Sequence, residues 1–351
     1  MLKFKPIWFD SLGAKSSCCL IQTPDASILI DPGIAAMQRS FPASDYQKAL
    51  WKKEGYKEIK KAAEKADIII ITHYHYDHFK DFDKQLYQKK LIFAKNPNIW
   101  INDSQRKRAF KFYSKYVKTF GKKDIEDLLK QPQIISVENP LENLPIALAK
   151  DFGSYNKRRA KLLKKGEKWF FQRVKNWKKY PQIPELNFSK EKVKWADKRS
   201  FQIGSTKIRF SPPLFHGIEF SRVGWILSVI IETKNKKFLY SSDMNGPIIE
   251  DYAQFIIKEN PDILVLDGPM TYMLGYTLNL INFKRTIENA KSIFNQTTIK
   301  LIIYDHHLTR EPHFRERTKE IWSLSSRKRK ILTAAEYLGK KPVVECLKKT
   351  S

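Results

Sequence analysis

The sequence contains few cysteines and no long apolar run. Its 351 residues include only Cys18, Cys19 and Cys346, and the first two are adjacent. This set makes no disulfide framework, and no C-x-x-C pair is present to bind zinc through thiolates. No run approaches the ~20 apolar residues that cross a bilayer, and the first residues lack the apolar core of a secretory signal. These absences predict a soluble protein of the reducing cytoplasm, with no membrane partner.

Acidic residues are also scarce relative to basic ones. The chain has 65 Lys and Arg against 37 Asp and Glu, a formal net charge of +28. Hydrophobic residues at 42% and aromatic residues at 13% are enough for a sizeable core, which excludes wholesale disorder. A charge of this size attracts polyanions, although charge alone does not establish a nucleic-acid function.

The positive charge is concentrated between Tyr155 and Tyr180. This stretch has eleven Lys or Arg and a single acid, Glu167, with six aromatic residues interspersed. A surface that neutralises phosphates and stacks on bases would use this mixture. A helix whose aromatic residues pack on the body of the protein explains the same spacing, and the spacing favours this second interpretation. A second basic stretch, residues 106–123, allows the same two interpretations.

Strand and helix patterns alternate over most of the chain. Apolar runs predict strands at 7–9, 19–22, 27–30, 67–72, 207–210, 225–232, 237–240, 263–266 and 299–304. Helical spacing predicts helices at 46–65, 252–260 and 282–295. This alternation predicts an α/β fold. Residues 101–200 are basic and poor in strand signals, so we expect a mostly helical insertion within a single domain that spans 1–351.

Four potential metal ligands follow the buried strand predicted at 67–72. They are His73, His75, Asp77 and His78. An extended backbone puts the first two imidazoles on one side, and the other two approach where the chain turns. Imidazole and carboxylate together suit Zn²⁺ or another borderline divalent ion. A loop that is His-rich by chance is a poor alternative, because three of the chain's seven histidines are gathered here.

Other predicted strands also deliver histidine or aspartate at their carboxyl ends. His216 and Asp243 each follow a strand, and His306 and His307 end another. Functional groups collect at this edge of α/β sheets. His313 lies in a charged loop and is predicted to be an ordinary surface residue.

These residues together resemble the metallo-β-lactamase-fold hydrolases. The family motif H-x-H-x-D-H is matched in full by His73-x-His75-x-Asp77-His78. The later elements of the family also follow in order: a lone His at 216, an Asp at 243 and a late-strand His. More narrowly, the chain resembles an uncharacterised archaeal branch of this superfamily, and this resemblance covers most of the length except the basic middle. The segments that carry it include Asp10-Ser11-Leu12-Gly13, Ser211-Pro212-Pro213, Asp267-Gly268-Pro269 and Asp305-His306-His307-Leu308.

The resemblance implies an αββα sandwich of the metallo-β-lactamase type, with the basic helical stretch as an insertion, and two divalent metal ions. Zinc is the expected ion, with manganese or iron as alternatives. The implied ligands are His73, His75 and His216 for one ion and Asp77, His78 and His306 for the other, with Asp243 between them. His307 competes with His306 for the last position, because the two would point to opposite faces if the strand continued through them.

Two such ions would polarise a scissile group and hold a bridging hydroxide at neutral pH. Asp77 either orients that hydroxide as a catalytic group or serves only as a ligand. Asp31 either orients a ligand histidine or caps a turn. Arg222 and Arg310 either contact an anionic substrate or form surface ion pairs with Glu219 and Glu311.

The expected function is that of a metal-dependent hydrolase acting on an anionic substrate. A phosphodiester, RNA or DNA included, is the first expectation, because the ligand pattern is combined with a basic stretch. The alternatives are a hydrolase of a small ester, thioester or lactone, with the basic stretch as a lid, and a non-catalytic binding protein that holds metal for structure. The sequence makes no prediction of the oligomeric state.

Overall fold

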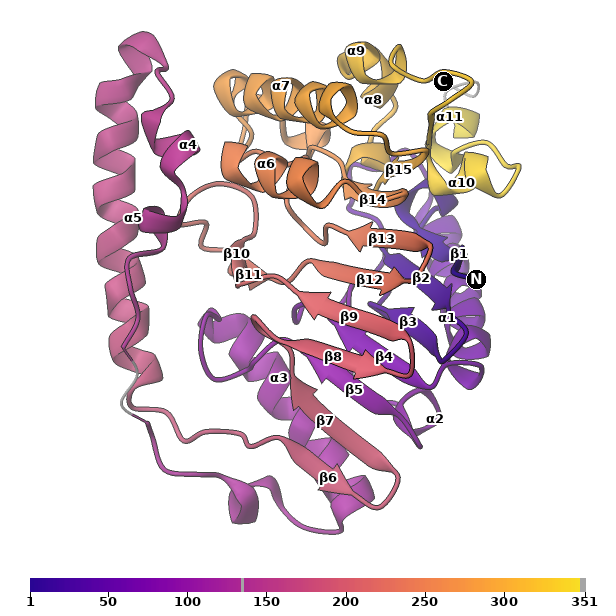
Figure 1. Ribbon diagram of the computed structural model, residues 1–351, viewed down its shortest axis with the longest axis vertical. Helices are drawn as coiled ribbons and strands as arrows, with labels where there is room; N and C mark the ends of the chain where they lie inside the picture. Colours follow the sequence, from indigo (N-terminus) through magenta and orange to yellow (C-terminus); the bar gives the residue numbers. More distant parts are fainter. Residues whose placement is uncertain (134–135, 348–351) are drawn as a thin grey trace.

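Two seven-stranded sheets form the centre of the computed structural model, which describes residues 1–133 and 136–347 (Figure 1). The first sheet contains, in spatial order, β1 (Lys3–Phe9), β2 (Ser17–Gln22), β3 (Ser27–Ile30), β4 (Ile68–Ile71), β5 (Leu91–Ala94), β7 (Glu191–Trp195) and β6 (Leu186–Phe188). The second contains β16 (Lys330–Leu332), β15 (Leu301–Asp305), β14 (Ile263–Asp267), β13 (Lys236–Tyr240), β12 (Val229–Thr233), β9 (Thr206–Phe210) and β8 (Ser200–Ile203). A separate two-stranded ribbon pairs β10 (Leu214–Phe215) with β11 (Trp225–Ile226).

The strands of both sheets divide their apolar side chains between two cores. In β4, Ile68 and Ile70 belong to the core between the sheets, whereas Ile69 and Ile71 belong to the core under the helices. Across the sheets, the rings of Phe4 and Phe238 lie 5.7 Å apart. A strand that is buried on both faces needs a continuous apolar sequence, which explains the unbroken isoleucine run of β4.

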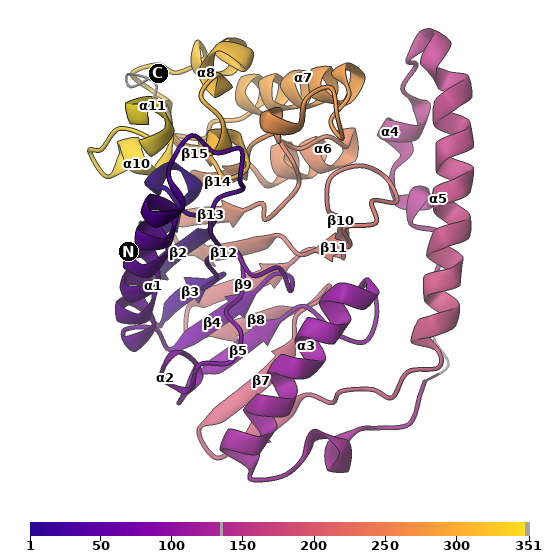
Figure 2. The same cartoon turned by 180° about the vertical axis from the view of Figure 1, so that it is seen from behind.

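Helices cover the outer faces of the two sheets (Figure 2). The longer ones are α1 (Asp45–Glu64), α3 (Asp103–Tyr116), α6 (Glu250–Glu259) and α7 (Leu280–Gln296). Helix α5 (Asn156–Trp177) instead stands at one side of the molecule, next to the β10–β11 ribbon (Figure 2). The shorter ones are α2 (Lys84–Tyr87), α4 (Pro145–Ala149), α8 (Phe314–Arg317), α9 (Lys319–Trp322), α10 (Ala334–Tyr337) and α11 (Val343–Leu347). The predicted αββα sandwich is therefore confirmed. In the part of the chain that the structure describes, no helix combines the length and apolar character that a membrane crossing requires.

The strand predicted over residues 225–232 is broken in the middle. Trp225–Ile226 pairs in the ribbon, and Val229–Thr233 pairs in the second sheet. Between them, the Leu227 amide donates to the Thr72 carbonyl, and the Ser228 hydroxyl donates to the Ser241 carbonyl. These bonds hold the two residues where the chain passes from the ribbon to the second sheet. The sequence is apolar on both sides of this break and therefore does not reveal it.

Residues 101–200 contain strands as well as helices. The strands β6 and β7 extend the first sheet, and β7 runs parallel to β5. In β7, lysines alternate with the buried Val193 and Trp195, since this strand lies near the edge of the sheet. That alternation hides the strand from a search for apolar runs. An insertion with the boundaries 101–200 stays a prediction.

Candidate metal centre

The seven predicted ligands meet at the carboxyl ends of strands from both sheets and from the ribbon. The motif after β4 supplies four of them, and the segments that follow β10, β13 and β15 supply His216, Asp243 and His306. Strands β13, β14 and β15 are parallel neighbours, so their carboxyl ends lie at one edge. His216 begins the loop between β10 and β11, which is closed by a 3.0 Å hydrogen bond from its amide to the Gly224 carbonyl. Residues distant in sequence thus converge at one place.

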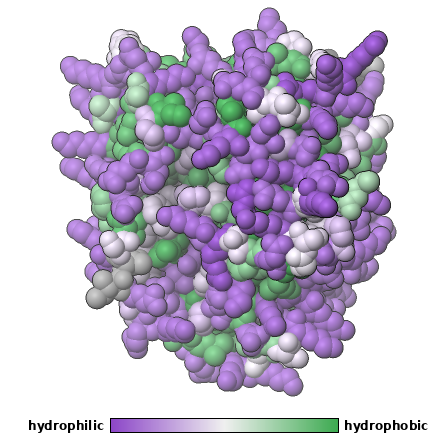
Figure 3. Space-filling view, viewed as in Figure 1, coloured by the Kyte–Doolittle hydropathy of each residue, from purple (hydrophilic) through white to green (hydrophobic). Residues whose placement is uncertain are grey.

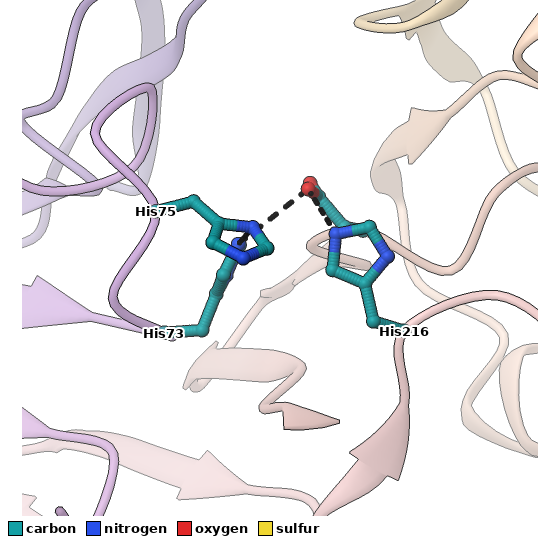
Figure 4. A group of neighbouring side chains, drawn as sticks. His73, His75 and His216 are labelled. Atoms are coloured by element: carbon teal, nitrogen blue, oxygen red, sulfur yellow. Dashed lines mark hydrogen bonds and ion pairs between the residues drawn. The ribbon is translucent and has the colours of Figure 1, made fainter. Parts of the chain in front are cut away.

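A first donor group contains His73, His75, His216 and Asp243 (Figure 4). Their ligand atoms all lie within 4.8 Å of one another. The distance from His73 Nε2 to His75 Nδ1 is 3.1 Å. Asp243 Oδ2 lies 2.9 Å from His216 Nε2 and 3.5 Å from His73 Nε2. This group corresponds to the ligands expected for the first ion and the aspartate expected between the ions.

A second donor group contains Asp77, His78 and His306. The Nε2 atoms of the two histidines are 3.0 Å apart. The other oxygen of Asp243, Oδ1, lies 2.8 Å from His78 Nε2 and 3.4 Å from His306 Nε2. Asp243 therefore offers one carboxylate oxygen to each group, which is the arrangement expected of a bridging ligand.

His306 and His307 both face the site, although they differ in their neighbours. The strand ends at Asp305, and both histidines have positive φ angles, 33° and 30°. The strand therefore does not continue through the two histidines, which was the condition for their pointing to opposite faces. His306 joins the second group, whereas Nδ1 of His307 contacts Asp267 Oδ1 at 2.8 Å and its Nε2 is 4.0 Å from Asp243. The geometry favours His306 as the last ligand of the second group, and the assignment stays a prediction.

The donor atoms of both groups fit divalent cations. Asp243 Oδ1 is buried, and no donor within the described residues reaches it with hydrogen-bond geometry. The Nε2 atoms of His78 and His306 also face each other at 3.0 Å, and in the neutral form each would offer a lone pair there. A cation allows such lone pairs to converge. Imidazole and carboxylate ligands suit zinc and similar divalent ions.

The two groups differ in their electrostatics. Burial and the neighbouring His216 lower the pKa of His75 to about 3, and burial and His78 lower that of His73 well below its ordinary value. Burial also opposes charge on His78, but the Asp243 carboxylate raises its pKa to about 10. Neutral imidazole is the form that binds metal. The first group is thus held ready for a ligand role, and the carboxylates of the second group stabilise positive charge.

Asp31 lies buried beneath the second group and contacts a predicted ligand, His78. Its Oδ2 is 2.8 Å from His78 Nδ1 and accepts a hydrogen bond from Tyr240 Oη at 2.9 Å. The two oxygens also accept bonds from the amide and hydroxyl of Thr72, at 2.8 and 2.6 Å. A carboxylate on the far nitrogen of a ligand histidine fixes its ring orientation and tautomer. Of the two interpretations, the geometry favours Asp31 as an orienting residue.

Sequence reasoning assigned no role to two further aspartates of the site. Asp10 Oδ1 lies 3.1 Å from His306 Nδ1, and Asp267 Oδ1 lies 2.8 Å from His307 Nδ1. Asp267 is the last residue of β14, so the strand-end pattern that indicated Asp243 also applied to it. Asp10 follows β1 and belongs to one of the segments that carry the family resemblance. It lies 296 residues from its histidine partner in the sequence.

Arg310 is buried at the site, with only 4% of its surface exposed. Its Nε contacts Asp10, and its Nη2 lies 3.2 Å from Asp77 Oδ2. The surface ion pair that was one of the two alternatives for Arg310 is not formed with Glu311, which lies 3.3 Å from Arg317 instead. Arg310 therefore holds the carboxylate of Asp77 in place.

Arg222 and His313 are exposed. Glu219, a possible partner of Arg222 in one of the two alternatives, forms ion pairs of 2.8 and 2.9 Å with Arg159 and Arg285 instead. His313 lies outside both donor groups with 59% of its side chain exposed, as expected of a surface residue.

The chain is similar to known proteins at the level of family, whole sequence and fold. Residues 13–142 match the family described as the metallo-beta-lactamase superfamily. A UPF0282 protein of Korarchaeum cryptofilum is 29% identical over 342 residues, which cover 97% of this chain and 90% of the relative. One from Methanopyrus kandleri is 28% identical over 354 residues, covering 97% and 94%.

Among solved structures, the metallo-beta-lactamase fold protein YhfI from Bacillus subtilis aligns with 14% identity and a TM-score of 0.42, covering 95% of this chain and 96% of that one. The family match and the two packed sheets carry the assignment of the fold. The chain has the metallo-β-lactamase fold and is similar over almost its whole length to archaeal UPF0282 proteins.

Proposed function

We propose that this chain is a dinuclear metal-dependent hydrolase of phosphodiesters, nucleic acids included. The observation that carries the proposal is the position of Asp243, whose two oxygens lie in separate donor groups. Two divalent ions bound there would supply Lewis-acid polarisation of a phosphoryl oxygen and a water-derived nucleophile near neutral pH. Zinc suits the ligands, and manganese or iron are the alternatives.

Asp77 is the residue of the chain that we expect to handle the proton of the attacking water. Burial opposes its charge, but His78 and Arg310 together hold the pKa of its carboxyl well below the ordinary value. Arg310 contacts Oδ2, and no ion pair involving Oδ1 is found within the described residues. Oδ1 is therefore placed to accept a hydrogen bond from the water and to orient it.

Two cations beside the site favour an anionic substrate over a neutral ester. Arg108 Nε donates to the Tyr74 carbonyl at 2.6 Å, and its guanidinium lies 5.5 Å from the centre of the Tyr76 ring. Tyr74 and Tyr76 flank His75, so Arg108 is held next to the first donor group. Lys15 is partly buried near Asp77 and Arg310, and burial lowers its pKa. Over the described ranges, neither cation has a carboxylate within ion-pair distance, and a phosphodiester would compensate their charge.

Replacing Arg108 with alanine should therefore weaken hydrolysis of phosphodiesters selectively. A hydrogen bond to a charged group is worth about 1.5–3 kcal/mol, so kcat/KM should fall roughly 10- to 100-fold, mainly through KM. Steady-state kinetics on a phosphodiester and on a neutral carboxyl ester measure the difference. Lys107→Ala, an exposed neighbour on the same helix, is the matched control. An equal loss on both substrates would contradict a role in anion binding.

The function itself is tested with protein stripped of metal and then reloaded with Zn²⁺ or Mn²⁺. Single-stranded RNA, single-stranded DNA and bis(p-nitrophenyl) phosphate are the substrates. We expect hydrolysis only after reloading, with activity lost in His75→Ala and retained in His313→Ala. Hydrolysis of esters or lactones alone would support the alternative function. Metal binding without any hydrolysis would support a binding protein and overturn the proposal.

A further inference from the structure

The basic helix α5 uses three of its four aromatic residues for packing, whereas Phe171 is 39% exposed. Phe170 and Trp177 are buried, and Trp169 stacks on Trp225 with ring centres 5.7 Å apart and an angle of 8° between the planes. Phe170 also lies 5.9 Å from the ring of Phe220. These rings belong to the core, as the second interpretation of the sequence predicted, so they are not available to stack on bases.

The opposite face of α5 is a stripe of exposed lysines. Successive members are three, four or seven residues apart, which places them on one side of the helix. The stripe consists of Lys157, Lys161, Lys164, Lys168 and Lys175, and Lys179 follows in the turn after the helix. Arg158 and Lys165 are exposed beside it. Hydrophilic side chains project from this edge of the molecule, at the left in Figure 3.

These eight cations have no carboxylate partners among the residues that the structure describes. The single acid of α5, Glu167, is bonded instead to the side chain of Asn139. Helix α1, of similar length, differs in this respect because its lysines alternate with acids, as in the 2.7 Å ion pair of Lys61 with Glu58. The two helices therefore differ in the balance of their charges, because α1 has four acids among its lysines and α5 has one.

Helix α5 packs directly on the loop that carries a predicted metal ligand. This loop, residues 216–224, begins at His216. Arg159 of α5 forms a 2.8 Å ion pair with Glu219, and a Cβ at Gly166 would lie only 2.5 Å from the Cβ of Phe220. Leu162 lines a small cavity together with Ile218.

Arg158 and Lys165 lie four residues before and three residues after Leu162, so they share its side of the helix. The positive face thus extends from the outer stripe to the side of α5 that lies against the loop 216–224.

We infer that this face of α5 binds the phosphate backbone of a nucleic-acid strand and guides the strand toward the metal centre. The 22 residues of α5 correspond to about 33 Å of helix, long enough for several successive phosphates. An anionic membrane is a poorer partner, because a helix that lies in a membrane inserts its apolar face, and α5 uses that face in the core. One part of this inference rests on the proposed function, namely that the bound strand is the substrate.

The test is RNA binding by the full chain, measured without metal. Fluorescence anisotropy with labelled single-stranded RNA compares the native protein with the variant K157Q/K161Q/K164Q/K168Q. Each phosphate contact in a single strand adds about 0.7 to the salt dependence, so losing four should lower the slope of log K against log salt by about 3. At moderate salt the affinity should fall about 10-fold or more.

The matched control removes the same charge from another helix. Lys52, Lys53, Lys57 and Lys65 in and after α1 are exposed, and K52Q/K53Q/K57Q/K65Q likewise lowers the formal charge from +28 to 28 − 4 = +24. We expect its RNA affinity to stay within about twofold of native, since counterion release is local to the contacts. Thermal unfolding of both variants checks that they are folded.

Equal weakening in the two variants, or none in the α5 variant, would overturn the inference. Binding to vesicles of phosphatidylcholine and phosphatidylserine in place of RNA would also overturn it. RNA binding through α5 without any metal-dependent hydrolysis would refute the proposed function and leave this surface standing. Metal-dependent hydrolysis of RNA by a protein whose RNA affinity does not depend on α5 would support the proposed function and overturn the inference about this surface.

Discussion

Replacing Asp243 with alanine should remove metal from both donor groups. Each carboxylate oxygen of this buried residue lies in a different group, at 2.9 Å from His216 Nε2 and 2.8 Å from His78 Nε2. The carboxylate also offsets the repulsion between two neighbouring cations. Metal catalysis contributes several kcal/mol, so hydrolysis should fall at least about 10³-fold. Elemental analysis should show a fall from two ions per chain to none.

Two matched variants separate loss of the bridge from loss of a single ligand. His75→Ala affects only the first group, so about one ion per chain should remain on Asp77, His78, Asp243 and His306. His313→Ala changes an exposed histidine that lies outside both groups, and two ions should remain. If Asp243→Ala retains both ions, the carboxylate does not bridge the groups, and the dinuclear proposal is wrong.

Replacing Asp31 should give the second largest effect, and two variants divide it into stability and ligand orientation. In Asp31→Ala, Thr72 and Tyr240 lose the acceptor of buried hydrogen bonds. An unsatisfied buried polar group costs about 1–3 kcal/mol, so the free energy of unfolding should fall by about 3 kcal/mol. Urea unfolding of metal-free protein measures this loss.

Asp31→Asn keeps the shape of the side chain but replaces one oxygen with an amide donor. If that amide faces Nδ1 of His78, the imidazole must carry its proton on Nε2, the nitrogen that faces Asp243. That tautomer cannot bind metal through Nε2. Residues that orient metal ligands typically contribute 10- to 100-fold, so metal affinity and activity should fall by roughly that factor, with a smaller loss of stability. Competition titration with a chelator measures the affinity, and an unchanged value would contradict the orienting role.

The strands and the main ligand motif could be predicted because their signals are local. A strand buried on both faces requires a continuous apolar run, which made β4 and β14 visible. The histidines and aspartates that follow such runs must lie at the carboxyl edge, since the polar chain leaves the sheet there. Strand β7 was missed because its lysines face outward near the edge of the sheet and interrupt the run.

The contacts that complete the site could not be predicted because they join distant parts of the chain. Arg310 approaches Asp10 across 300 positions, and Asp31 approaches His78 across 47. The orientation of His306 and His307 depends on two positive φ angles after Asp305, which the apolar pattern of β15 does not encode.

The sequence by itself determined which residues can bind metal, where the strands before them end, and that α5 has a positive face. Each of these depends on residue type and short-range spacing. Only the tertiary structure decided that Asp10 contacts His306, that Arg310 faces inward, and that the aromatic side of α5 packs against Trp225. These outcomes follow from the packing of the two sheets, because side chains from separate segments acquire neighbours only when that packing brings them together.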